Sequence, residues 1–115
     1  MSKINENMLS AIAEFSASPP ASLRGKQFDN TRVDAKDSSL RVFLHGNLIA
    51  SSDDSGASWE VNLCGWNTST TRSRLTALIR SKGFPGVSTK GGTPRLHDAR
   101  GITEIDTGQF HKVHF

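Results

Sequence analysis

Hydroxyl and guanidinium side chains gather at the start of one predicted helix, where they could hold an anion. The chain there reads Trp66-Asn-Thr-Ser-Thr-Thr-Arg72-Ser-Arg74, which is a polar cap followed by arginines. A helix start has unpaired backbone N–H groups and the positive end of the helix dipole, and both favour a phosphate or a carboxylate. An ordinary, well-capped helix has the same composition, so the pattern alone leaves both interpretations open.

Polar side chains continue along this predicted helix, on the side away from Leu75 and Leu78. At helical spacing one exposed side carries Ser69, Arg72, Ser73, Thr76 and Arg80. Arginines on such a face can reach a phosphate backbone, or they can meet the acidic surface of a protein partner. A charged face on a surface helix is most often simply solvated, and this is the third alternative.

A second basic segment follows the helix, between residues 88 and 95. Lys90 and Arg95 flank Gly91-Gly92 there, and glycines let backbone N–H groups approach a phosphate closely. The segment lacks the spacing of a Walker A loop. Loops of this composition are usually plain connectors, so its basic residues add to the predicted binding surface without defining it.

The sequence contains no recognisable catalytic or metal-binding pattern. His111 and His114 are three residues apart, which on a strand places them on opposite faces, and Cys64 is the only cysteine. No nucleophile elbow or dinucleotide fingerprint occurs. We therefore expect no catalytic residues, no metal and no cofactor. A phosphoester-acting enzyme using His97-Asp98 is a distant alternative, because the further ligands it needs are not found.

The composition indicates one small domain, spanning residues 1–115. The chain has a formal net charge of +3, a pI of about 9.4 and only 35% hydrophobic residues, which is compatible with a polyanionic or acidic partner but also with plain solubility. No apolar run approaches the roughly 20 residues of a membrane span. We expect a soluble, intracellular protein with no membrane contact; its oligomeric state is left open.

Apolar spacing predicts the elements that position these residues. Residues 1–20 contain an amphipathic helix, with Ile4, Met8, Ile12 and Phe15 in one stripe. Residues 21–39 read as an edge strand or a long loop. Residues 40–83 form the predicted core, a three-stranded antiparallel meander followed by the second helix, which runs from Asn67 or Thr68 to about residue 81.

The first hairpin of the meander is predicted to turn at Gly46-Asn47, since this pair tolerates positive φ. That register pairs Leu44 with Ile49 and Val42 with Ser51. It places Val42, Leu44 and Ile49 on one face and Phe43, Leu48 and Ala50 on the other. Trp59, Val61 and Leu63 alternate as the third strand, so Trp59 belongs to the core, while Trp66 covers the junction of helix and sheet.

After the second helix, residues 84–101 read as a flexible basic loop with room for a short strand. Residues 102–115 read as a C-terminal β-hairpin around Asp106-Thr-Gly108. The predicted fold class is therefore α+β: N-terminal helix, three-stranded meander, second helix and C-terminal hairpin. This order resembles the topology of double-stranded-RNA-binding domains, with Thr71-Arg72-Ser73-Arg74 where those domains carry a basic cluster.

The middle third of the chain resembles small uncharacterised proteins of tailed bacteriophages. The resemblance lies in a Gly46-Asn47 hairpin, then Gly65-Trp-Asn-Thr68, then Thr71-Arg-Ser-Arg-Leu75 opening a helix. It implies a phage origin and a small accessory role, without an activity. We expect a non-catalytic protein in the cytoplasm of an infected bacterial host, taking part in host takeover or anti-defence. Its partner would be a host or defence protein or, alternatively, nucleic acid bound at the same basic surface.

Overall fold

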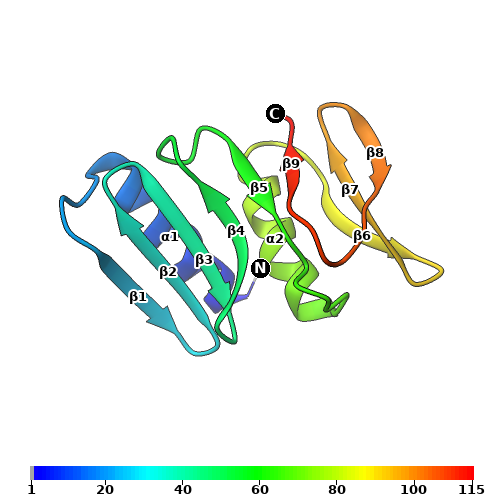
Figure 1. Ribbon diagram of the computed structural model, residues 1–115, viewed down its shortest axis with the longest axis horizontal. Helices are drawn as coiled ribbons and strands as arrows, with labels where there is room; N and C mark the ends of the chain where they lie inside the picture. Colours follow the sequence, from blue (N-terminus) through cyan, green and yellow to red (C-terminus); the bar gives the residue numbers. More distant parts are fainter. Residues whose placement is uncertain (1) are drawn as a thin grey trace.

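The computed structural model describes residues 2–115, in which two helices and nine strands follow one another (Figure 1). The elements are α1 (Lys3–Ala17), β1 (Arg24–Phe28), β2 (Thr31–Lys36), β3 (Ser39–Leu44), β4 (Asn47–Ser52), β5 (Trp59–Val61), α2 (Ser69–Arg80), β6 (Gly86–Lys90), β7 (Thr93–Asp98), β8 (Gly101–Glu104) and β9 (His111–Val113).

Six of these strands form one antiparallel sheet in the order β1-β2-β3-β4-β5-β9. Both helices lie against the same face of this sheet, as Figure 1 shows. Alternate residues of β2 and β3 are buried under the helices, which fits one covered face and one open face. The buried core includes Met8 and Phe15 of α1, Leu75 of α2 and Trp59 of β5.

The other three strands form a small antiparallel sheet, β6-β7-β8, beside α2. Thr76 joins the two: its hydroxyl donates to the Val87 carbonyl and accepts from the Val87 N–H, both at 3.1 Å. Gly86 lies so close to α2 that a Cβ there would stand 2.8 Å from the Thr76 Cα, and its φ is +109°. Glycine is required at this position because the backbones of β6 and α2 approach so closely.

The chain returns to the large sheet through β9, and hydrogen bonds join the two sheets on the way. The Ala99 N–H donates to the His114 carbonyl at 2.8 Å, and the His114 N–H donates to the buried Asp98 carboxylate at 2.9 Å. Farther along, the Gly65 N–H donates to the Thr107 carbonyl at 2.6 Å. Buried residues of both sheets, including Leu96 and Val113, belong to one core cluster.

The α+β class and both predicted helices are confirmed, with Ser2 and Thr68 as the N-caps. The predicted three-stranded meander is too short. Residues 21–39, predicted as an edge strand or a loop, form β1 and β2, so five consecutive strands make up the meander and β9 adds a sixth. In β1 the alternation typical of a strand is interrupted by Gly25. The Arg32 guanidinium occupies the space that a side chain at this position would need.

The predicted register of the β3–β4 hairpin is wrong. The turn is His45-Gly46, both with positive φ, and Leu44 pairs with Asn47. The register then shifts at a bulge: Phe43 pairs with Leu48, but the next residue, Val42, pairs with Ala50. Because of this irregularity both Ile49 and Ala50 are buried, whereas strict alternation predicts Ala50 on the opposite face.

The C-terminal third differs most from the prediction. Residues 84–101, predicted as a flexible loop, contain β6 and β7. The predicted hairpin in 102–115 does not form, because β8 pairs with β7 and β9 pairs with β5. The predicted turn at Asp106 and Gly108 does form, since the Asp106 carboxylate accepts from the Gly108 N–H at 3.1 Å. It connects β8 of the small sheet to β9 of the large sheet.

Candidate functional site

A sharp backbone turn leads into α2 and orients the side chain before it. Cys64 and Gly65 both have positive φ, at 54° and 80°, so the chain reverses within two residues. Thr68 then caps the helix: its Oγ1 accepts from the Thr71 N–H at 3.2 Å and lies 2.9 Å from the Thr71 hydroxyl. Trp66 lies between turn and cap and remains 61% exposed, which corrects its predicted place as a cover for the helix–sheet junction.

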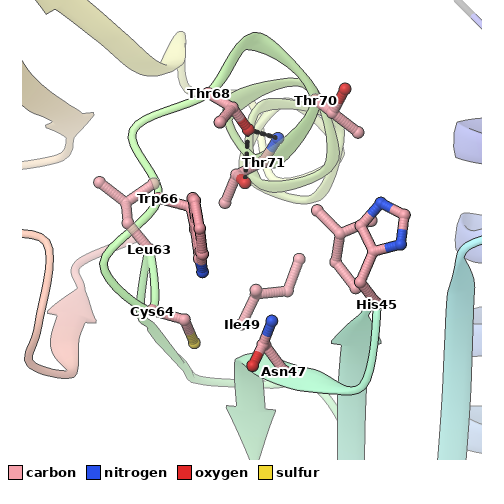
Figure 2. A pocket seen from close by; sticks show the side chains of 10 residues that line it. His45, Asn47, Ile49, Leu63, Cys64, Trp66, Thr68, Thr70 and Thr71 are labelled. Carbon is pink, nitrogen blue, oxygen red and sulfur yellow. Dashed lines mark hydrogen bonds between the residues drawn. The ribbon is translucent and has the colours of Figure 1, made fainter.

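Trp66 forms one side of a pocket of about 420 Å³ between the start of α2 and the β3–β4 turn. Figure 2 shows Trp66 and His45 on opposite sides of this pocket, with Ile49 between them. The residues that line it are Leu44, His45, Asn47, Ile49, Leu63, Cys64, Trp66, Thr68, Thr70 and Thr71. None of them is an Asp, Glu, Lys or Arg, so the pocket suits an uncharged, largely apolar group.

Cys64 lines the pocket as a thiol. Its Sγ–H donates to the Leu48 carbonyl at 2.9 Å, and burial raises the pKa of the thiol. The thiolate is the nucleophilic form of cysteine, and a raised pKa disfavours it at neutral pH. In this pocket Cys64 therefore forms a small, weakly polar part of the lining.

The residues predicted to share one exposed side of α2 are among its less buried residues, but three of them make contacts within the protein. Arg72 turns back onto the helix start, where its Nη1 donates to the Asn67 carbonyl and Oδ1 at 2.9 and 2.6 Å. Ser73 faces α1, and its Oγ accepts from Asn5 Nδ2 at 3.0 Å. Thr76 packs on β6 through Val87. The prediction did not include α1 and β6, which partly cover this side of α2.

The other predicted binding residues are spread apart, and all but the half-buried Arg95 are exposed. Ser69 lies at the first residue of α2 and Arg80 at the last, where the Arg80 Nε donates to the Pro85 carbonyl at 3.3 Å. Lys90 is at the end of β6, and Arg95 lies 3.9 Å from the Glu104 carboxylate on the next strand. Their role in binding stays a prediction, since they form no continuous basic stripe.

The tip of the small sheet does approach the start of α2. Asn67 Nδ2 donates to the Thr89 Oγ1 at 3.0 Å and to the Gly92 carbonyl at 3.1 Å. Neighbouring residues of a strand point to opposite faces of the sheet. Because the side chain of Thr89 contacts Asn67, that of Lys90 is directed away from Asn67. Lys90 and Arg95 therefore extend over the outer face of the small sheet, away from the pocket.

Comparison with known protein families shows which family this chain belongs to. The chain matches the family described as Kyanoviridae Gp96 protein over residues 1–113. It belongs to this family of phage proteins. Searches of curated proteins and of solved structures give no match. The predicted phage origin is thus confirmed at the level of the family, while the importance of the Gly65-Trp66-Asn67 motif stays a prediction.

In this Gp96 family member, sequence reasoning missed a buried arginine on α2. Arg74 is only 6% exposed. Its Nε donates to Thr31 Oγ1 and its Nη1 to Asn5 Oδ1, both at 2.9 Å, and its Nη2 lies 3.3 Å from Asn30 Oδ1. Burial lowers the pKa of this guanidinium, and the carboxylate of Asp29 acts in the opposite direction.

Helical spacing could have predicted that Arg74 is buried, because residue 74 precedes Leu78 by four and so lies on the buried side of the helix. The phage protein thus uses this arginine as an internal connection between α1, α2 and the β1–β2 turn. It is not accessible to a partner.

Two further observations concern the described part of the chain. Within residues 2–115 no helix is long and apolar enough to cross a membrane. In the same residues no cluster of three or more His, Cys, Asp and Glu side chains is arranged to hold a metal ion.

Proposed function

We propose that this chain is a non-catalytic accessory protein of the phage that binds a host or defence protein in the cytoplasm of the infected bacterium. The binding site is the pocket between Trp66 and His45, into which the partner inserts an apolar or aromatic side chain. One observation carries the proposal: a tryptophan is 61% exposed at the rim of a pocket of about 420 Å³.

Exposed tryptophans are costly in water and dominate binding energy when a partner covers them. The floor of the pocket is made by Ile49 and Leu63, both almost fully buried, so it is rigid and apolar. Thr70 and Asn47 supply hydrogen-bonding groups to its lining. A charged side chain would lose its hydration there without meeting an opposite charge, so the inserted group is uncharged.

The distribution of charge favours a protein over nucleic acid. Binding to a phosphate backbone requires several free cations along one path. Arg72 is bonded to Asn67, and Arg95 lies near Glu104. Arg80 and Lys90 are exposed, but they lie at the end of α2 and at the tip of the small sheet. Trp66 can stack on a base, yet the large exposed apolar residues include no second aromatic from the same loop.

The test is affinity capture from host lysate with the tagged wild-type chain and with Trp66→Ala. We expect the wild type to retain a specific protein that Trp66→Ala loses. Leu23→Ala is the matched control, because Leu23 is 66% exposed but precedes β1, outside the pocket. With the purified partner, Trp66→Ala should weaken the affinity by about 30-fold, which corresponds to a hot spot of about 2 kcal/mol.

Retention of the same partner by Trp66→Ala would contradict the site. Binding of labelled DNA or RNA that weakens steeply with salt would instead make nucleic acid the target. In that case Arg80→Ala and Lys90→Ala should each lower the salt dependence, because each removes one phosphate contact.

A further inference from the structure

One of the two outer strands of the small sheet, β8, has a free edge. Among residues 2–115, β8 (Gly101–Glu104) pairs with β7 alone, and Figure 1 shows it at the outer side of the β7–β8 hairpin. All four of its residues are exposed, and Ile102 is exposed to 60%. A strand with an unpaired edge and an exposed apolar side chain is a template for another strand.

The register identifies which backbone groups are free. Ile105 donates its N–H to the Pro94 carbonyl at 3.0 Å, beyond the last paired residues of β7 and β8. Hydrogen-bonded pairs alternate with non-hydrogen-bonded pairs in an antiparallel ladder. The pairs Leu96–Thr103 and Asp98–Gly101 are therefore hydrogen-bonded, and the N–H and C=O groups of Ile102 and Glu104 point away from β7.

The other outer strands of similar length are protected. β6, at the opposite edge of the small sheet, bonds Thr76 of α2 through both the N–H and the C=O of Val87. β1 carries Arg24 and Lys26, so two copies of β1 brought edge to edge would place like charges near each other. β9, at the opposite edge of the large sheet, has three residues only. In contrast, the β8 segment has Arg100 in the turn before the strand and Glu104 at its end, with Ile102 midway between them. The Glu104 carboxylate also lies 3.9 Å from Arg95 of its own chain.

We propose that β8 is a self-association edge at which a second copy of this chain pairs in antiparallel orientation. The register places Ile102 opposite the partner's Ile102, and the free backbone groups of these two residues bond each other across a two-fold axis. Arg100 then faces the partner's Glu104, and Glu104 faces the partner's Arg100. The two small sheets become one continuous antiparallel sheet.

Opposite charges at equal distances from Ile102 make this segment complementary to itself only in the antiparallel orientation. Cross-strand pairs of opposite charge stabilise a sheet, and like charges directly opposite destabilise it. The contact is small, so the dimer forms at high protein concentration. It leaves the pocket beside Trp66 outside the interface, because that pocket is lined from β3, β4 and the start of α2 and not from β8.

Sedimentation velocity of the full chain from micromolar to millimolar concentration tests the proposal. We expect a monomer–dimer equilibrium in the wild type, lost in Ile102→Asp and kept in the control Leu23→Asp, whose residue is similarly exposed but precedes β1. Circular dichroism of each variant verifies that the fold is kept. A wild type that stays monomeric throughout, or a dimer that survives Ile102→Asp, would overturn the proposal.

Charge reversal supplies a second, independent readout. Arg100→Glu alone and Glu104→Arg alone should each weaken self-association by about tenfold, because like charges then face each other twice. Mixing the two variants should restore dimers, since every pair across the axis becomes opposite again. Failure of the mixture to associate better than either variant would place the interface elsewhere.

Discussion

Arg74 shows how one side chain can connect elements that are far apart in the sequence. Its acceptors come from α1 and from the β1–β2 turn, and all three are neutral oxygens. A buried charge costs solvation energy unless it is hydrogen-bonded, and here each donor nitrogen has a partner. Asn5 adds a further link, since its Nδ2 donates to Ser73 Oγ at 3.0 Å. The two helices therefore meet through polar contacts at this end and through apolar side chains along the rest.

We predict that Arg74→Met destabilises the protein by about 2 to 4 kcal/mol, because it leaves the Asn5 and Thr31 oxygens buried without a donor. Urea unfolding measures this free energy. Arg80→Met, at the exposed end of the same helix, is the control and should change stability by less than about 0.5 kcal/mol. If Arg74→Met were as stable as the wild type, the cost of burying the charge would equal the gain from its hydrogen bonds.

At the scale of elements, the connection between β4 and β5 depends on a carboxylate. Asp54 accepts from the Ser58 hydroxyl at 2.5 Å and from the Ser58 N–H at 2.9 Å. Its Oδ1 also accepts from the Ser52 hydroxyl, which in turn accepts from the Gly56 N–H. The bonds from Ser58 are the main reason that the pKa of Asp54 falls to about 2.

This lowered pKa predicts an acid sensitivity of the β4–β5 turn. A carboxyl whose pKa is lower in the folded than in the unfolded state stabilises the fold above its unfolded pKa, and the contribution disappears as the pH falls towards the folded pKa. Stability should therefore decrease between about pH 4 and pH 2. Asp54→Asn should reduce this decrease in urea unfolding measured across that pH range, whereas Glu60→Gln should not. An identical decrease in Asp54→Asn would contradict the role of the turn.

The predicted elements are correct where a stripe of side chains is buried by the element itself. The Ile4–Phe15 stripe and the pair Leu75 and Leu78 identified both helices, and Trp59 was recognised as a core residue. β6 was missed because its position depends on α2, through Thr76 and the close approach at Gly86. Local composition there is rich in glycine and threonine and contains no hydrophobic alternation.

The candidate site was predictable in part. The polar start of α2 and its cap at Thr68 follow from the sequence. The pocket does not, because it needs the β3–β4 turn, whose register depends on a bulge that alternation cannot reveal. The exposure of Trp66 likewise depends on the positive φ of Cys64, a residue type that rarely adopts it.

At the scale of the whole molecule, the question is whether the two sheets unfold as one. Leu96 of β7 and Val87 of β6 belong to the same buried cluster as Trp59 of β5 and the helices. The Ala99 N–H donates to the His114 carbonyl and the His114 N–H donates to the Asp98 carboxylate, and these two bonds connect the small sheet to the end of β9. Because the two sheets share one core and are hydrogen-bonded to each other near His114, we expect them to unfold in a single cooperative transition.

We therefore predict that Leu96→Ala, in the small sheet, destabilises the large sheet equally. The lost contacts and the cavity should cost about 2 to 5 kcal/mol. In a Trp66→Phe background, fluorescence reports only Trp59 in the large sheet, and far-ultraviolet circular dichroism reports both sheets. The two urea transitions should coincide and shift together to lower denaturant. If Trp59 kept its original midpoint while part of the dichroism was lost earlier, the small sheet would be an independent unit, because then its core contacts would not be coupled to those around Trp59.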